Sequence, residues 1–152
     1  MVCRMTKILV IEDEAPIRDK IVTVLKYEDY AVIDATNGLE GVTLAQENRP
    51  DLIICDVLMP DLNGYGALAA LRDNPNTSDI PVIFLTAAAS RADMRKGMEM
   101  GADDYITKPY TVEELLAAVR TRLGRQETIK RAASDADGDA NGGNSPEGTV
   151  NS

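Results

Sequence analysis

Polar side chains that could take part in chemistry follow short apolar runs of this sequence. Glu12 and Asp13 follow the run KILVI, Asp56 follows LIIC, Thr86 follows VIFL, and Lys108 follows the weaker run DYIT. Taken singly, each of them is typical of a turn or a solvated loop, because Asp forms turns and acidic side chains cap helices. Their chemistry therefore depends on whether the fold brings them together.

Three carboxylates in one small pocket would repel each other strongly unless a cation neutralised them. Oxygen ligands suit a hard divalent cation, and Mg²⁺ fits best because it binds few carboxylates and keeps waters that a phosphate can replace. A lysine would add a second positive charge and a threonine a hydroxyl. Together with a carboxylate nucleophile that forms an acyl phosphate, these groups would make a phosphoryl-transfer site.

The elements that must position these side chains alternate between strand and helix. Five strands, each followed by a helix, predict an α/β fold with a parallel sheet, helices on both faces and right-handed crossovers. Such sheets bind ligands at the carboxyl ends of their strands. The predicted strands are Lys7–Ile11, Ala31–Thr36, Leu52–Cys55, Val82–Leu85 and Asp104–Thr107, and the predicted helices are Ala15–Tyr27, Gly38–Asn48, Tyr65–Arg72, Ser90–Met100 and Thr111–Leu123.

Local signals define the faces and ends of two of these helices. In the second helix, the spacing of Leu39, Val42 and Ala45 predicts that these three side chains face inward. At the start of the last helix, Thr111 and Glu114 have the spacing of a capping box.

Composition excludes several classes of function. A net charge of −9 makes the chain a poor candidate for nonspecific binding to nucleic acids or anionic membranes. The chain has no histidine, so any phosphohistidine must come from a partner. The two cysteines form no disulfide framework, which fits a cytoplasmic location. No stretch reaches the roughly 18 apolar residues that span a membrane.

The alternating pattern covers one domain and then stops. Residues 1–6 are expected to form an N-terminal extension and residues 7–124 the domain itself. Residues 125–152 are expected to form a disordered acidic and polar tail, because a segment rich in Asp, Gly, Asn and Ser buries too little to offset its ordering entropy.

Four segments together resemble the receiver domain of two-component response regulators. They are KILVIEDE, LIICDVLMPDLNGYG, VIFLTAAA and GADDYITKPY, which occur in the family's order and spacing over about residues 6–124. The resemblance implies a flavodoxin-like (βα)5 doubly wound fold with strand order 2-1-3-4-5. It also implies a stand-alone, CheY-like receiver.

The resemblance assigns roles in phosphoryl transfer. Asp56 would be the phosphoacceptor, and Lys108 would pair with the phosphoryl group. Glu12, Asp13, Asp56 and the main-chain carbonyl of Leu58 would bind Mg²⁺. The Lys108–Pro109 peptide bond is expected to be cis. Glu12 departs from the Asp that many relatives have there, and we expect metal binding to survive this change.

The resemblance also implies a conformational switch. Thr86 would hydrogen-bond a phosphoryl oxygen, and Tyr105 would then turn inward. This change would shift the surface formed by Ser90–Met100, Asp104–Thr107 and Thr111–Leu123. The donor would be a histidine kinase or a histidine phosphotransfer protein. About thirty mostly polar residues follow Leu123, so the output is expected to be a partner protein bound to that surface, without direct DNA or membrane binding. The same surface would allow a homodimer.

The expected function is therefore a phosphorylation-dependent signalling switch, and not an enzyme that turns over outside substrates. Leu58 and Ala88 occupy positions that tune aspartyl-phosphate hydrolysis in the family, and both are apolar here, which predicts a long-lived phosphoryl group.

One alternative is a receiver-like interaction module that is never phosphorylated. Others are a dinucleotide-binding module, disfavoured because EDEAP is not a glycine-rich loop, and an aspartyl phosphotransferase, disfavoured because Leu58 is not a second acid.

Overall fold

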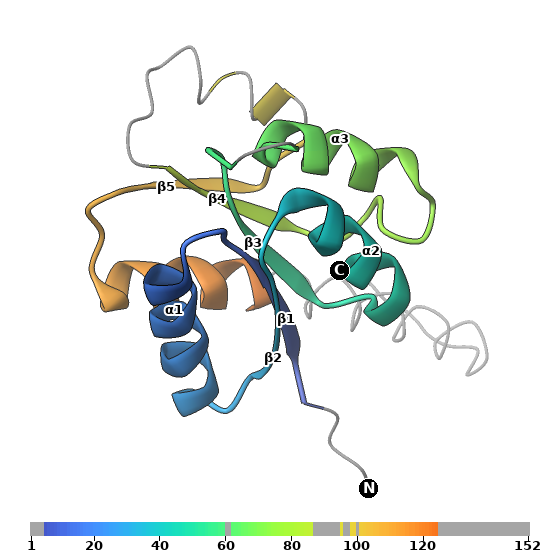
Figure 1. The fold of residues 1–152 in the computed structure, drawn as a ribbon. Coiled ribbons are helices and arrows are strands. Elements are labelled where there is room, and N and C mark those ends of the chain that lie inside the picture. The colour runs from blue at the N-terminus through green and yellow to red at the C-terminus, as the bar shows by residue number, and fades with distance from the viewer. Residues whose placement is uncertain (1–4, 60–61, 87–94, 96–97, 100, 125–152) are drawn as a thin grey trace, which may run out of the picture.

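A computed structural model describes residues 5–59, 62–86, 95, 98–99 and 101–124. Its five strands form one parallel sheet in the order β2-β1-β3-β4-β5 (Figure 1), which confirms the expected flavodoxin-like fold. The strands are β1 (Lys7–Ile11), β2 (Ala31–Ala35), β3 (Leu52–Asp56), β4 (Val82–Thr86) and β5 (Asp104–Thr107). The helices are α1 (Ala15–Tyr27), α2 (Gly38–Asn48) and α3 (Gly64–Asp73), followed by the C-terminal helix over residues 112–124.

Two hydrophobic cores lie on opposite faces of this sheet. The α1-side core joins the sheet to α1 and the C-terminal helix, and it contains Ile54 and Val119. The α3-side core joins the sheet to α2 and α3, and it contains Phe84 and Leu68. Every residue of β3 and β4 is buried, as expected of central parallel strands covered on both faces. The carboxyl ends of the central strands are therefore held rigidly.

Two strands extend one residue further than the sequence pattern predicts. Asp56 is the last residue of β3 and Thr86 is the last residue of β4, where periodicity alone ended each strand one residue earlier. Asp56 pairs with Leu85 in the β3–β4 register, and Thr86 pairs with Thr107 in the β4–β5 register. The polar side chains at these positions consequently project from ordered strand backbone. Strand β2 is one residue shorter than predicted, because it ends at Ala35 and not at Thr36.

The prediction that Leu39 faces inward is wrong, because its side chain is 63% exposed. Helix α2 instead buries Gly38, Gly41 and Ala45. A β-carbon on Gly41 would stand 2.4 Å from a side-chain atom of Ile11, so the helix approaches β1 too closely for a larger residue. The glycine face of α2, and not Leu39, meets the sheet.

The capping box at the start of the C-terminal helix is confirmed. Glu114 N–H donates to the Thr111 hydroxyl oxygen at 3.0 Å, and Thr111 N–H donates to the Glu114 carboxylate at 2.8 Å. The start of α3 is capped in a related way by Asn63, whose side-chain oxygen accepts from Gly66 N–H at 2.9 Å.

Several predictions fall on residues that the structure does not describe. They concern most of the expected helix Ser90–Met100, the position of Ala88, residues 1–4 of the extension and the tail over 125–152. In the part of the chain that is described, no helix has the length and apolarity needed to cross a bilayer.

Candidate functional site

Three charged side chains lie at the carboxyl ends of three strands, on the same face of the sheet. Glu12 directly follows β1, Asp56 ends β3, and Lys108 directly follows β5. Side chains two residues apart on a strand point to the same face, so strand geometry places all three above the α1-side core. The residues two positions before them are Val10, Ile54 and Ile106, which all belong to or pack against that core.

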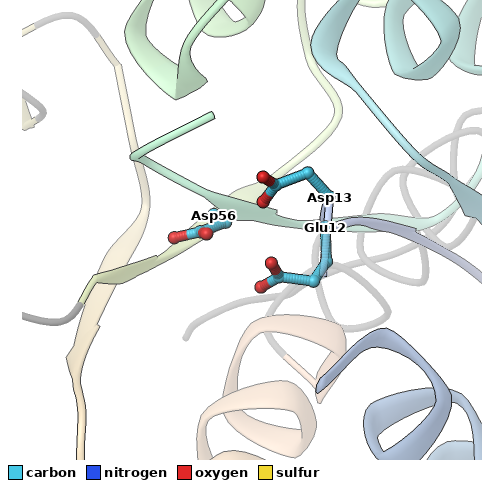
Figure 2. Close-up of side chains that lie close together, drawn as sticks. All are labelled: Glu12, Asp13 and Asp56. Atoms are coloured by element: carbon cyan, nitrogen blue, oxygen red, sulfur yellow. The ribbon is translucent and has the colours of Figure 1, made fainter. Parts of the chain in front are cut away.

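The three predicted carboxylates form one cluster. One carboxylate oxygen from each of Glu12, Asp13 and Asp56 lies within 4.8 Å of the other two. Figure 2 shows the side chains of Glu12 and Asp13 extending from the end of β1 toward the side where Asp56 lies. Glu12 is 1% exposed and Asp56 is 6% exposed, so both charges are largely removed from water.

Lys108 supplies the positive charge that the sequence predicted for this pocket. Its ammonium nitrogen lies 3.8 Å from Glu12 Oε1 and 3.8 Å from Asp56 Oδ1. The Lys108 backbone is tied to β4, because its N–H donates to the Thr86 carbonyl at 2.7 Å. The Lys108–Pro109 peptide bond is cis, as expected. Among the described residues, Lys108 thus pairs with two of the three carboxylates of the cluster, Glu12 and Asp56.

Burial and mutual repulsion change the protonation of this cluster. Loss of hydration on burial is the main cause that raises the pKa of Glu12 to about 7, and the negative charge of Asp56 acts in the same direction, whereas the hydrogen bond from Glu14 N–H and the charge of Lys108 oppose the change. Burial also raises the pKa of Asp56 above its usual value, and Lys108 limits the rise. Glu12 and Asp56 therefore lack a counter-charge sufficient to keep both of them fully ionised.

The donor set fits a hard divalent cation. In the described part of the chain, Glu12 Oε1 and Asp13 Oδ1 are buried and accept no hydrogen bond. Buried carboxylate oxygens normally have a partner, and oxygen ligands from a few carboxylates are what Mg²⁺ takes. Leu58 lies two residues beyond Asp56 with its side chain 65% exposed. The role of its carbonyl as a ligand stays a prediction.

The backbone around Glu12 is fixed by hydrogen bonds from three directions. Its N–H donates to the Ala35 carbonyl at the end of β2, at 3.1 Å. Its carbonyl accepts from Arg18 Nη1 at 2.9 Å, and its second carboxylate oxygen accepts from Glu14 N–H at 3.1 Å. These contacts leave Oε1 as the atom of Glu12 that faces Lys108 and the cluster. Sequence reasoning missed Arg18, because the helical pattern alone does not distinguish it from any other polar residue of α1, although its side chain is only 14% exposed.

Asp56 is fixed by the close approach of α3, which sequence reasoning also missed. A β-carbon built on Gly64 would stand 2.7 Å from the Asp56 carbonyl oxygen and 2.9 Å from Val57 Cα. Gly64 N–H donates to the Val57 carbonyl at 2.9 Å. The sequence pattern predicted the helix only from Tyr65, whereas the structure requires a residue without a side chain at position 64.

The two predicted switch residues lie beside the pocket on the other face of the sheet. Thr86 is 3% exposed at the end of β4. Tyr105 is half-buried in β5, opposite Phe84, with ring centroids 5.5 Å apart in an edge-to-face arrangement. Both side chains lie on the α3 side, as strand alternation requires. Their functional roles stay predictions.

Comparisons with known proteins agree with this geometry. Residues 8–120 match a family model described as the response regulator receiver domain. The chain is 42% identical over 129 residues to the "DNA-binding dual master transcriptional regulator RpaA" of Synechocystis, covering 85% of this chain and 54% of that protein. It spans about half the length of the curated transcriptional regulators it matches.

Solved structures share the fold at a sequence identity of about one third. Chemotaxis protein CheY4 of Vibrio cholerae is 31% identical, with a TM-score of 0.75, covering 78% of this chain and 98% of that one. The receiver domain of sensor histidine kinase PA1611 from Pseudomonas aeruginosa PAO1 is 30% identical, with a TM-score of 0.74, covering 80% and 99%. That structure carries a magnesium ion coordinated in its active-site cleft.

The prediction of a partner protein as the output, without direct DNA binding, is wrong in light of these relatives. It rested on the number of polar residues after Leu123 and on the net charge. The Synechocystis relative is named as DNA-binding, and this chain spans 54% of it. The charge of a receiver domain describes that domain's own surface and carries no information about the DNA-binding part of such a regulator.

Proposed function

Because the chain belongs to the response regulator receiver domain family, we propose that it is a signalling switch phosphorylated on Asp56. The donor is a phosphohistidine of a histidine kinase or histidine phosphotransfer protein. An Asp56 carboxylate oxygen bonds to phosphorus while the bond between phosphorus and the donor imidazole nitrogen breaks. The imidazole keeps the electron pair of that bond, and Asp56 becomes an acyl phosphate.

The observation that carries this proposal is the placement of Asp56 between one lysine and two further carboxylates. The Lys108 ammonium group, 3.8 Å from Asp56 Oδ1, is positioned to pair with a negatively charged phosphoryl group. Phosphoryl transfer depends mainly on positioning and on charge stabilisation, which a buried, fixed pocket provides. Because Asp56 is buried, the surrounding residues limit the access of bulk water to an acyl phosphate formed there.

Mg²⁺ is the cofactor we propose for this site. Glu12, Asp13, Asp56 and the Leu58 carbonyl would hold it, and the buried oxygens of Glu12 and Asp13 without hydrogen-bond donors support this assignment. When bound, Mg²⁺ supplies positive charge against the carboxylates and the phosphoryl oxygens. The residues of the chain fix Asp56 and its counter-charge in place.

The switch follows from the neighbours of the pocket. Thr86 ends β4, the strand paired with the one that carries Asp56, and this neighbourhood supports the proposal that its hydroxyl binds a phosphoryl oxygen after transfer. Movement of Thr86 then makes room for Tyr105 to turn further inward. A phosphoryl group shifts this balance only by interacting differently with the two arrangements. The chain acts on itself and turns over no outside substrate.

We propose control of a DNA-binding transcriptional regulator as the output. The support is the 42% identity to a relative named as a DNA-binding transcriptional regulator. The pocket in this chain would set the activity of that output through the state of Asp56.

Intact-mass measurement with acetyl phosphate and Mg²⁺ tests this function. The expected result is a gain of one phosphoryl group that requires Mg²⁺ and is absent in Asp56→Asn. Asp34→Asn is the matched control, because the Asp34 side chain is 49% exposed and pairs with Arg18 outside the carboxylate cluster. Failure of the wild-type protein to gain mass, even with a phosphorylated histidine phosphotransfer protein as donor, would favour an interaction module without phosphorylation.

A further inference from the structure

Two tyrosines that contact the same buried phenylalanine ring are joined to each other through their hydroxyl groups. Tyr65 lies in the first turn of α3 and Tyr105 lies in β5, and their hydroxyl groups form a hydrogen bond. Phe84 of β4, which is fully buried, contacts both rings edge to face, with centroid distances of 5.4 Å to Tyr65 and 5.5 Å to Tyr105. The three rings connect α3 to β5 across β4.

The Tyr65 end of this contact is tied to the phosphoacceptor backbone. Gly64, the residue before Tyr65, lies so close to Asp56 that a β-carbon would stand 2.7 Å from the Asp56 carbonyl oxygen. Gly64 N–H also donates to the Val57 carbonyl at 2.9 Å. The backbone that carries Tyr65 therefore cannot move independently of Asp56 and Val57.

We propose that Tyr65 is a positioning residue that holds Tyr105 in its inward orientation against Phe84. The inference rests on the proposed function and deepens it: the state of Asp56 reaches Tyr105 through α3 as well as through Thr86. Tyr65 holds Tyr105 inward before phosphorylation. It thereby sets the fraction of unphosphorylated protein in which Tyr105 already has its inward orientation.

The hydroxyl group of Tyr65 distinguishes this role from simple packing. Phenylalanine would fill the same half-buried space and would keep the edge-to-face contact with Phe84. The tyrosine hydroxyl adds a directional bond to Tyr105, which fixes how the second ring is oriented. Loss of one such bond is expected to shift the ratio of inward to outward Tyr105 about fivefold.

The test measures the solvent exposure of Tyr105 in protein labelled with 3-fluorotyrosine. The readout is the fluorine shift between H₂O and D₂O, at a pH where fluorotyrosine is neutral, with Tyr105→Phe identifying the resonance. In Tyr65→Phe, we expect a larger solvent shift for Tyr105 and one cooperative unfolding transition whose midpoint falls no more than the loss of one hydrogen bond explains. Tyr27→Phe is the matched control, because Tyr27 is 85% exposed. An unchanged Tyr105 solvent shift in Tyr65→Phe would overturn the proposal.

Beryllofluoride with Mg²⁺, a stable mimic of an aspartyl phosphate, tests the link to Asp56. Because Tyr65→Phe starts with less inward Tyr105, beryllofluoride should reduce the Tyr105 solvent shift more in this variant than in the wild type. An equal reduction in both proteins would overturn the link. If Asp56 is not phosphorylated, the proposed function is rejected but the role of Tyr65 is not. The Tyr105 solvent shifts of the wild type and Tyr65→Phe are compared in unmodified protein, which needs no phosphoryl group.

Discussion

The backbone of Gly64 lies against the carbonyl oxygen of Asp56, so closely that a β-carbon at position 64 would stand 2.7 Å from that oxygen. This approach brings the first turn of α3 onto the strand end that carries the phosphoacceptor. A contact of 2.7 Å with backbone cannot be relieved by turning a side chain.

Gly64→Ala is therefore expected to lower the free energy of unfolding by about 1–3 kcal/mol, as overpacking of a tight site does. Chemical denaturation measures the change. Gly124→Ala is the matched control, because a β-carbon there would meet nothing within 4 Å. We expect the control to be neutral or slightly stabilising, since alanine is a better helix former than glycine. Equal effects of the two substitutions would show that the close approach is not maintained in solution.

Arg72 at the end of α3 holds together the segments that lead into β4 and β5. Its guanidinium donates to the carbonyls of Ile80 and Gly101, each at 2.7 Å, and to Asp103 at 3.3 Å. Asp103 also accepts from Val82 N–H at 2.8 Å. These contacts fix the starts of both strands.

We expect Arg72→Met to lower the free energy of unfolding by about 1.5–3 kcal/mol, because it leaves carbonyls and a carboxylate without their charged donor. Arg120→Met is the comparison, since the Arg120–Glu28 pair is 3.6 Å long and its Arg120 side chain is 58% exposed. Exposed pairs contribute less than about 1 kcal/mol. Denaturant titration of both variants distinguishes these cases, and an Arg120 effect as large as that of Arg72 would contradict the assignment.

The carboxylate cluster predicts how stability depends on pH without Mg²⁺. The pKa of Glu12 rises from 4.5 to about 7 on folding, so in this range the folded protein binds more protons than the unfolded chain. Its contribution to stability is complete below about pH 4.5 and is lost as the pH rises through about 7. The free energy of unfolding should therefore decrease across this window more in the wild type than in Glu12→Gln.

Mg²⁺ should reverse this trend, because it binds the ionised carboxylates. The increase in melting temperature on adding Mg²⁺ is expected to be small near pH 5 and larger at pH 8. Thermal denaturation at several pH values, with and without Mg²⁺, measures both effects. Glu12→Gln that kept the full wild-type pH dependence would show that Glu12 is not the group responsible.

The sequence was sufficient to predict the five strands, most of the helices and the five polar residues at the strand ends, because hydrophobic periodicity is local. It could not show that α2 meets β1 through Gly41, because a close backbone approach overrides the apolar spacing that pointed Leu39 inward. It could not show the contact between Tyr65 and Tyr105, which are 40 residues apart. Strand order came from the family resemblance and not from periodicity.

Leu58 predicts a slow loss of the phosphoryl group. It follows Asp56 by two residues and is apolar and 65% exposed, so its side chain offers no polar atom to orient an attacking water. Leu58→Asn, which adds an amide at this position, should shorten the half-life of the phosphorylated protein. Intact-mass spectra at intervals after removal of acetyl phosphate measure the half-life. A wild-type half-life equal to or shorter than that of Leu58→Asn would contradict this role.

The central claim is that Asp56 itself becomes an acyl phosphate, and chemical trapping tests it most directly. Borohydride reduces an aspartyl phosphate to homoserine, and peptide mapping by mass spectrometry locates the reduced residue. After treatment with acetyl phosphate and Mg²⁺, we predict homoserine at position 56 and at no other aspartate, and none when Mg²⁺ is removed by chelation. Reduction at a different aspartate, or none in protein that has gained phosphate, would contradict the assignment of Asp56 as the phosphoacceptor.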